Sequence, residues 1–254
     1  IVAEHPGAAV EVAALDLASL ASVRAFAEAF ASRHARLDVL CNNAGVMALP
    51  RSKTADGFEM QLGTNHLGHF ALTGLLLQRL ASTPRARVVT QSSTAHRMGR
   101  IDFDDLHAER SYGKWAAYGQ SKLANLLFAY ELARRLERSG KDVISVACHP
   151  GYAATELQFA GPRMEGSSLM ERVMGLGNRL LAQSAAMGAL PMLFAATAPE
   201  LRGGDYVGPD GFGEAWGHPK KVGSNARSRD VEAAKRLWAV SGELTGVRYD
   251  ALAP

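Results

Sequence analysis

The sequence predicts an α/β protein in which a doubly wound parallel sheet carries helices on both faces. Short apolar runs alternate along the chain with longer segments in which apolar residues recur at helical spacing. The short runs are almost continuously apolar, which is typical of parallel strands buried on both faces. The chain shows no internal repeat, low-complexity tract or linker, so we expect one domain over residues 1–254.

The predicted elements alternate between strands and helices from the start of the chain. In order they are strand 10–17, helix 19–34, strand 36–45, helix 56–80, strand 87–93, helix 116–136, strand 142–151, helix 184–198 and strand 203–209. Ser19 is the expected N-cap of the first helix, and Gly140 is expected to stop the third. An Asn-Asn-Ala-Gly turn closes the second strand and a Pro-Gly turn closes the fourth. Residues 211–254 are expected to form a glycine-rich loop and a closing helix.

Composition argues against several classes of function. A net charge of +3 and a pI near 9.0 are mildly basic, but Lys and Arg are dispersed, so no nucleic-acid partner is expected. No apolar run is long enough to span a bilayer, so no membrane segment is expected in this chain. Cys41 and Cys148 lie in apolar strand-like runs, which favours buried reduced thiols and a cytoplasmic location. No oligomeric state is predicted.

Polar and small residues gather where the predicted strands end. Asp16 ends the first strand, residues 42–45 follow the second, Ser92 and Ser93 follow the third, and residues 150–155 follow the fourth. In open parallel sheets, ligands bind outside the carboxyl ends of the strands. These four segments therefore predict one continuous binding crevice.

Tyr118 and Lys122 are spaced to share one face of a helix. An ammonium within about 4–6 Å lowers the pKa of a tyrosine from about 10 toward the range of a general acid or base. Ser93 could donate a hydrogen bond to a carbonyl oxygen and stabilise charge there. Because residues alternate sides along a strand, only one of Ser92 and Ser93 should face the site. A chance spacing and a solvated loop serine are the simpler alternatives.

Asn65 lies inside a predicted helix, where asparagine is a poor helix former. It could hold a water, satisfy a backbone carbonyl at a kink, or lie on the surface. His66 and His69 stand three residues apart on an apolar helix with no acidic third ligand nearby, which argues against a metal site.

Two further segments allow two interpretations each. The small residues of Asn42-Asn43-Ala44-Gly45 would let the backbone approach a flat ligand closely, or they could simply form a turn. Asp16 could accept a hydrogen bond from an amine or a ribose, or it could cap the helix that follows.

The joint pattern strongly resembles the short-chain dehydrogenase/reductase family over about residues 10–210. The resemblance implies a Rossmann-like, three-layer αβα domain in which a hydride passes between a nicotinamide dinucleotide and a carbonyl or alcohol carbon. The resemblance implies that Tyr118 donates and accepts the proton, that Ser93 binds the substrate oxygen, and that Asn65 holds a relay water. It implies that Lys122 lowers the tyrosine pKa and binds the ribose. For the cofactor, it implies that Asp16 and Leu17 line the adenine end, that Asn43, Ala44 and Gly45 contact the adenosine and ribose, and that Ala153 and Thr155 contact the nicotinamide amide.

The sequence of residues 64–73 and 121–136 resembles that of the retinol-dehydrogenase-like branch of the family, which also includes light-dependent protochlorophyllide reductases. Residues 164–181 are apolar and rich in adaptable methionine. They predict a lid over a small lipophilic alcohol or carbonyl substrate, although the same stripe could simply pack on the domain. The branch resemblance favours NADP as the cofactor, with NAD as the alternative.

One feature of the family has no counterpart in the sequence. Family members begin with a strand, a glycine-rich turn and a helix, which together cradle a pyrophosphate. We therefore expect an N-terminally truncated domain that lacks its first βαβ portion and has a gap in its sheet. The alternatives to an oxidoreductase are a non-catalytic dinucleotide-sensing or interaction protein and an inactive fragment. Among enzymes, a sugar-nucleotide epimerase and a light-driven reductase are further alternatives.

Overall fold

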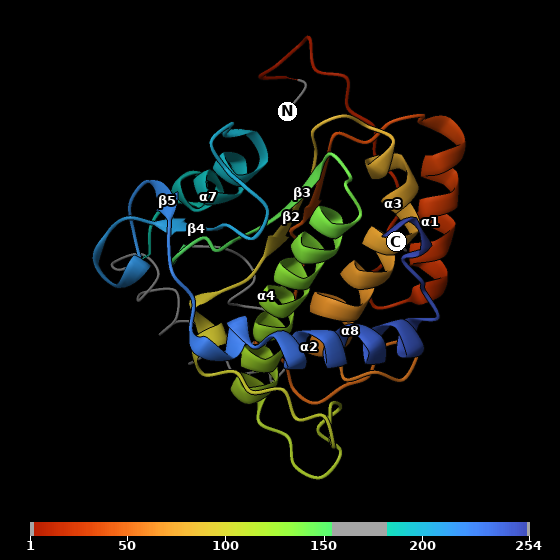
Figure 1. Cartoon of the computed structure of the whole chain (residues 1–254). Helices are drawn as coiled ribbons and strands as arrows, with labels where there is room; N and C mark the ends of the chain where they lie inside the picture. The colour runs from red at the N-terminus through yellow and green to blue at the C-terminus, as the bar shows by residue number, and fades with distance from the viewer. Residues whose placement is uncertain (1–2, 154–181, 253–254) are drawn as a thin grey trace.

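A five-stranded sheet runs through the middle of the computed structural model, which describes residues 3–153 and 182–252 (Figure 1). Its strands are β1 (Val39–Asn42), β2 (Ala86–Gln91), β3 (Val143–Cys148), β4 (Tyr206–Pro209) and β5 (Pro219–Lys221). They lie side by side in sequence order, and only β5 is antiparallel to its neighbour. The mainly parallel α/β sheet predicted from the sequence is confirmed.

Helices cover both faces of this sheet (Figure 1). Among the described residues, the helices of three or more turns are α1 (Leu20–Arg33), α3 (Gly68–Ala81), α4 (Lys114–Arg138), α7 (Ala185–Thr197) and α8 (Val231–Thr245). A core of buried apolar residues joins α1, α3 and α4 to one face of the strands, and a second core joins α7 to the other. The closing helix α8 packs across α4 and α3. In the described ranges, no helix combines the length and the apolar character needed to cross a membrane.

The helix ends predicted at Ser19 and Gly140 agree with the structure. The Ser19 side chain accepts from the Ser22 backbone N–H and caps α1 as expected. Helix α4 stops just before Gly140, which adopts a positive φ of 64° that favours glycine. Helix α7 is capped by Ser184.

The segment predicted as one helix over 56–80 is a continuous helical segment with an irregular centre. It begins at α2 (Met60–Leu62), widens into a π-helical turn over Gly63–Leu67 and continues as α3. The π-helical turn contains Asn65, the poor helix former singled out above. Such turns occur frequently at functional sites.

The register of the sheet brings the carboxyl ends of three strands together. Asn42 of β1 lies opposite Thr90 of β2, and Gln91 of β2 lies opposite Cys148 of β3. The turns that follow these strands therefore emerge at one edge of the sheet, where a ligand site was predicted.

The prediction of a strand over 10–17 is wrong. This segment has no strand structure, and Val12 is 96% exposed. A strand needs the N–H and C=O groups of a neighbour, and among the described residues no neighbouring strand pairs with this segment. Only Leu17 at its end is buried, in the core formed by α1 and α3. Strand β1 consequently forms the edge of the described sheet.

The two cysteines differ in burial. Cys148 in the central strand β3 is fully buried, as predicted. Cys41 was also expected to be buried, but it is exposed. Cys41 lies on β1, the edge strand of the described sheet, which no further described strand covers.

Candidate active site

A cavity of about 1070 Å³ opens at the carboxyl ends of the strands. It is bounded by the turns after β1, β2 and β3, the start of α4, the start of α7 and the loop after β4. Seven of the residues predicted for the site line it: Asn43, Ala44, Gly45, Ser93, Tyr118, Lys122 and Ala153. Tertiary folding thus brings together residues that are up to 110 positions apart in the sequence, from Asn43 to Ala153.

Tyr118 and Lys122 lie one turn apart near the start of α4, and both are buried. The Lys122 Nζ is 5.8 Å from the centre of the Tyr118 ring and donates to the Gln91 carbonyl oxygen at 3.3 Å. Burial lowers the pKa of Lys122 to about 8 because the charged form loses its hydration.

The expected lowering of the Tyr118 pKa is not what this arrangement produces. Burial raises the pKa of Tyr118, and a hydrogen bond with Ser93 opposes that rise only in part. Lys122 is close to the ring, but the loss of water around the phenol is the larger effect. The phenol is therefore held in its protonated form at neutral pH.

Both neighbouring serines line the cavity, but their hydroxyls have different partners. Ser93 caps the short 3-10 turn Thr94–Arg97 by accepting from the Ala95 N–H at 3.2 Å. The Ser92 hydroxyl donates instead to the Lys122 carbonyl oxygen at 2.8 Å, so it ties β2 to α4. The alternation of side chains predicted that the two serines would differ, and Ser93 was the one expected at the site.

Asn65 braces the turn that follows β1. Its Oδ1 accepts from the Val46 N–H at 2.7 Å, and its Nδ2 donates to the Val46 carbonyl oxygen and to Ser121 Oγ, both at 2.9 Å. Gly45 stands directly against this amide, because a Cβ at that position would lie 2.8 Å from Asn65 Oδ1. The turn therefore requires a residue without a side chain.

Asp16 and Leu17, both predicted for the site, are not brought to the cavity. Asp16 is exposed and its Oδ1 accepts from the Ala18 N–H at 2.9 Å, so it caps its own turn, whereas Ser19 caps the helix α1 that follows. Leu17 is buried in the core under α3 rather than facing the cavity. Thr155 and the predicted lid over 164–181 lie outside the described residues.

The histidines beside Asn65 have structural partners. His66 Nε2 lies 2.8 Å from Ser241 Oγ, and His69 Nδ1 lies 2.9 Å from the Asn65 carbonyl oxygen. Burial lowers the pKa of His66 to about 3 and that of His69 to about 4, so both rings are neutral. Over the part of the chain described, no group of three His, Cys, Asp or Glu side chains is placed to hold a metal ion.

Sequence reasoning missed several residues of the cavity. They are Met47, Gln91, Arg97, Met98, Trp115 and Glu214. Gln91 could have been found, because it lies two residues before the end of a predicted strand. Arg97 and Glu214 carry no local signal, since they meet only when two distant loops come together.

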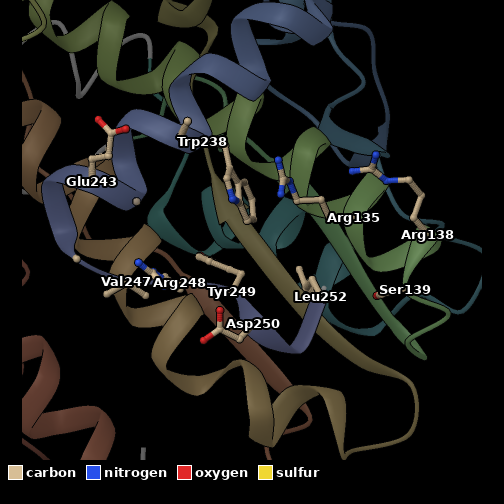
Figure 2. A pocket seen from close by; sticks show the side chains of 13 residues that line it. Arg135, Arg138, Ser139, Trp238, Glu243, Val247, Arg248, Tyr249, Asp250 and Leu252 are labelled. Atoms are coloured by element: carbon tan, nitrogen blue, oxygen red, sulfur yellow. The ribbon is translucent and has the colours of Figure 1, made fainter. Parts of the chain in front are cut away.

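A second cavity of about 770 Å³ lies between the ends of α4 and α8 and the C-terminal residues (Figure 2). The Arg135 guanidinium lies over the Trp238 ring at 4.4 Å, and Arg135 Nε donates to Glu131 at 2.7 Å. None of the predicted site residues lines this cavity. The first cavity is therefore the candidate active site.

Comparisons with known proteins agree on one family. The family model described as short chain dehydrogenase matches residues 1–165. Retinol dehydrogenase 12 of Homo sapiens is 44% identical over 243 residues, which covers 95% of this chain and 71% of that protein. Retinol dehydrogenase 13 of Homo sapiens is 45% identical over 235 residues, covering 92% of this chain and 68% of that protein.

Solved structures show the same similarity. A crystal structure of an uncharacterized protein from Mycobacterium paratuberculosis superimposes with a TM-score of 0.77 at 44% identity, covering 97% of this chain and 80% of that one. The Pseudomonas aeruginosa RhlG/NADP active-site complex superimposes with a TM-score of 0.53 at 25% identity, covering 76% of this chain and 72% of that one.

Proposed function

The chain belongs to the short-chain dehydrogenase family and is related to the retinol dehydrogenases, and on that premise we propose that it transfers a hydride between NADP(H) and a lipophilic alcohol or carbonyl compound. The observation that carries this proposal is the convergence of Ser93, Tyr118 and Lys122 on one cavity. A proton donor, an oxygen-binding hydroxyl and a buried ammonium are the groups that carbonyl reduction needs.

The cavity offers groups that fit the ribose and nicotinamide end of a dinucleotide. Lys122 Nζ has three N–H donors, of which the hydrogen bond to Gln91 uses one. The missing Cβ of Gly45 leaves open the space beside Lys122, because a Cβ there would lie 3.5 Å from Nζ. We propose that Lys122 binds the ribose hydroxyls, that Asn43, Ala44 and Gly45 flank the adenosine and ribose, and that Ala153 and Thr155 contact the nicotinamide amide.

When bound, the nicotinamide supplies or accepts the hydride. In the reductive direction Tyr118 Oη donates its proton to the substrate oxygen, and Ser93 Oγ donates a hydrogen bond to the same oxygen. The raised pKa of Tyr118 suits this step, because the phenol must carry its proton when the substrate arrives. The Lys122 ammonium, 5.8 Å from the ring, stabilises the phenolate that proton transfer leaves behind.

For Asn65 we propose a structural role in addition to the expected role of holding a relay water. Both N–H donors of its amide are used by Val46 and Ser121, so a relay water could only donate to the amide oxygen. Asp16 and Leu17 are proposed for the adenine end on the resemblance alone. In the structure Asp16 caps its own turn and Leu17 is buried in the core.

The choice of NADP and of a lipophilic substrate rests on similarity and on the cavity wall. The Pseudomonas aeruginosa structure is an active-site complex with NADP, and the human relatives are named as retinol dehydrogenases. Met47, Met98 and Trp115 give the cavity a large apolar wall that suits a retinoid-like alcohol or aldehyde. We propose that residues 1–254 act as a single NAD(P)-binding domain.

The test is nicotinamide absorbance with a panel of lipophilic aldehydes and alcohols, each offered with NADP(H) and NAD(H). The protein would be assayed as the 254-residue chain and together with any coding sequence that precedes it. We expect turnover that falls at least ~10²-fold in Tyr118→Phe, with cofactor binding retained. Cofactor binding without turnover, unchanged in Tyr118→Phe, would instead assign the protein to dinucleotide sensing.

A further inference from the structure

We propose that Glu214 is a positioning residue whose carboxylate holds together the turn that carries Ser93 and the turn that follows β3. This inference rests on the proposed function, because both turns form walls of the candidate active site. Glu214 itself lies on a third segment, the loop 211–217 after β4, and it also lines the cavity.

The Glu214 carboxylate receives donors from both neighbouring turns. Arg97, the last residue of the 3-10 turn capped by Ser93, places a guanidinium nitrogen 2.8 Å from Glu214 Oε2. His149, which directly follows β3, places Nε2 3.1 Å from the same oxygen. One carboxylate oxygen therefore joins three loops that are separate in sequence.

The contact with His149 is a hydrogen bond from a neutral ring in a defined tautomer. The Gly151 N–H donates to His149 Nδ1 at 3.3 Å, so Nδ1 carries no proton and Nε2–H is the donor to Glu214. His149 is 1% exposed, and burial lowers its pKa to about 3. The chain of bonds from Gly151 through His149 to Glu214 is therefore complete at neutral pH.

The backbone of loop 211–217 packs closely against the turn that follows β3. Glu214 has a φ of 59°, which is uncommon for a residue with a side chain, and Gly213 before it has a φ of 61°. The Ala215 carbonyl oxygen accepts from the Tyr152 N–H at 2.8 Å. Gly151 fits there only because it lacks a Cβ, which would lie 2.5 Å from that oxygen.

The consequence for the site is that the turn that carries Ser93 and the turn that follows β3, two walls of the cavity, are held in place together. Ser93 begins the turn that Arg97 ends, and Ala153 follows the turn that His149 begins. Releasing Glu214 frees both walls, and a misplacement of about 1 Å in a reacting group can cost about 10²-fold in rate. Breaking a surface ion pair that lacks this role should neither free a wall of the cavity nor lower the rate. The Arg51–Glu109 pair, at 2.6 Å with both side chains about half exposed, is the matched control.

The first experiment measures hydrogen exchange of the whole chain without any substrate. Glu214→Gln should raise amide exchange in residues 93–97 and 150–153 as well as in residues 211–217. Arg97→Met leaves the bond between His149 and Glu214 in place, so it should raise exchange in residues 93–97 and 211–217. Arg51→Met should leave all three segments unchanged. Faster exchange confined to loop 211–217 would overturn the proposal, because Glu214 would then not hold the turn after β3. This readout is independent of turnover, so it stands even if the proposed reaction is not found.

The second experiment measures kcat and KM with the best carbonyl substrate. Arg97→Met and Glu214→Gln should each lower kcat by about tenfold to a hundredfold, and the double variant should lose no more than the worse single variant. Additive losses would overturn the proposal. So would a rise in KM with unchanged kcat, because Glu214 would then contact the substrate rather than position the walls. If Glu214→Gln fails to fold, the half-exposed Arg97 still allows both tests with Arg97→Met.

Discussion

Replacing Lys122 by methionine should make the protein more stable at neutral pH while removing its turnover. The Lys122 side chain is 3% exposed, so its ammonium is held almost entirely out of water. Methionine has a similar length and no charge, and its burial is favourable. The Gln91 carbonyl oxygen would keep a donor, because Asn125 Nδ2 also binds it at 2.9 Å. The substitution therefore removes a buried charge without leaving an unpaired acceptor.

The size of the effect follows from the pKa of Lys122. A fall from 10.5 to about 8 corresponds to about 3 kcal/mol, at ~1.4 kcal/mol for each pKa unit. The unfolded chain keeps the lysine proton up to about pH 10.5, whereas the folded chain releases it near pH 8. Between these values the unfolded state binds more protons, so the stability of the parent protein rises with pH.

The assay is urea unfolding of the parent protein and Lys122→Met at several pH values from about 6 to about 10.5. We expect the variant to be more stable by about 3 kcal/mol below pH 8, with the difference fading toward pH 10.5. Lys235→Met is the control, because Lys235 is about half exposed and should contribute less than about 1 kcal/mol. A variant that is less stable than the parent, or a difference independent of pH, would refute the reasoning.

Three further predictions test the turns around the site and the edge of the sheet. Gly45→Ala should weaken cofactor binding and lower the free energy of unfolding by about 1–3 kcal/mol, because its Cβ would displace the Asn65 amide; titration calorimetry and urea unfolding check this. Gly99→Ala should also cost about 1–3 kcal/mol in urea unfolding, since its Cβ would overlap a backbone carbonyl of α4. Cys41 should react with a maleimide in the native protein faster than Cys148, which stays protected until unfolding, and equal rates for both thiols would contradict their difference in burial.

Local patterns predicted most of the secondary structure because they report local physics. The apolar face and Ser19 cap of α1, the positive φ at Gly140 and the apolar strands β2 and β3 all follow from interactions within a few residues. Residues 10–17 also have the composition of a strand, yet they form none. Composition specifies what a strand would bury, but only a neighbouring strand can supply its hydrogen bonds.

The same distinction between local and tertiary information applies to the prediction of the site. Tyr118 and Lys122 share a helix, so their spacing alone placed them together. The direction of the Tyr118 pKa depended on burial under the surrounding turns, which no spacing reports. Asp16 resembled a ligand-binding residue in sequence, but without strand structure around it the side chain caps its own turn.

By itself, the sequence determined the α/β class, the order of most elements and the family to which the protein belongs. It also determined the set of groups available for chemistry, because side-chain type and helical spacing are local properties. Only the tertiary structure decided which groups share the cavity, that the Ser92 hydroxyl ties β2 to α4, and that Glu214 meets Arg97 and His149. These outcomes depend on contacts between residues far apart in the chain, and on how much water those contacts exclude.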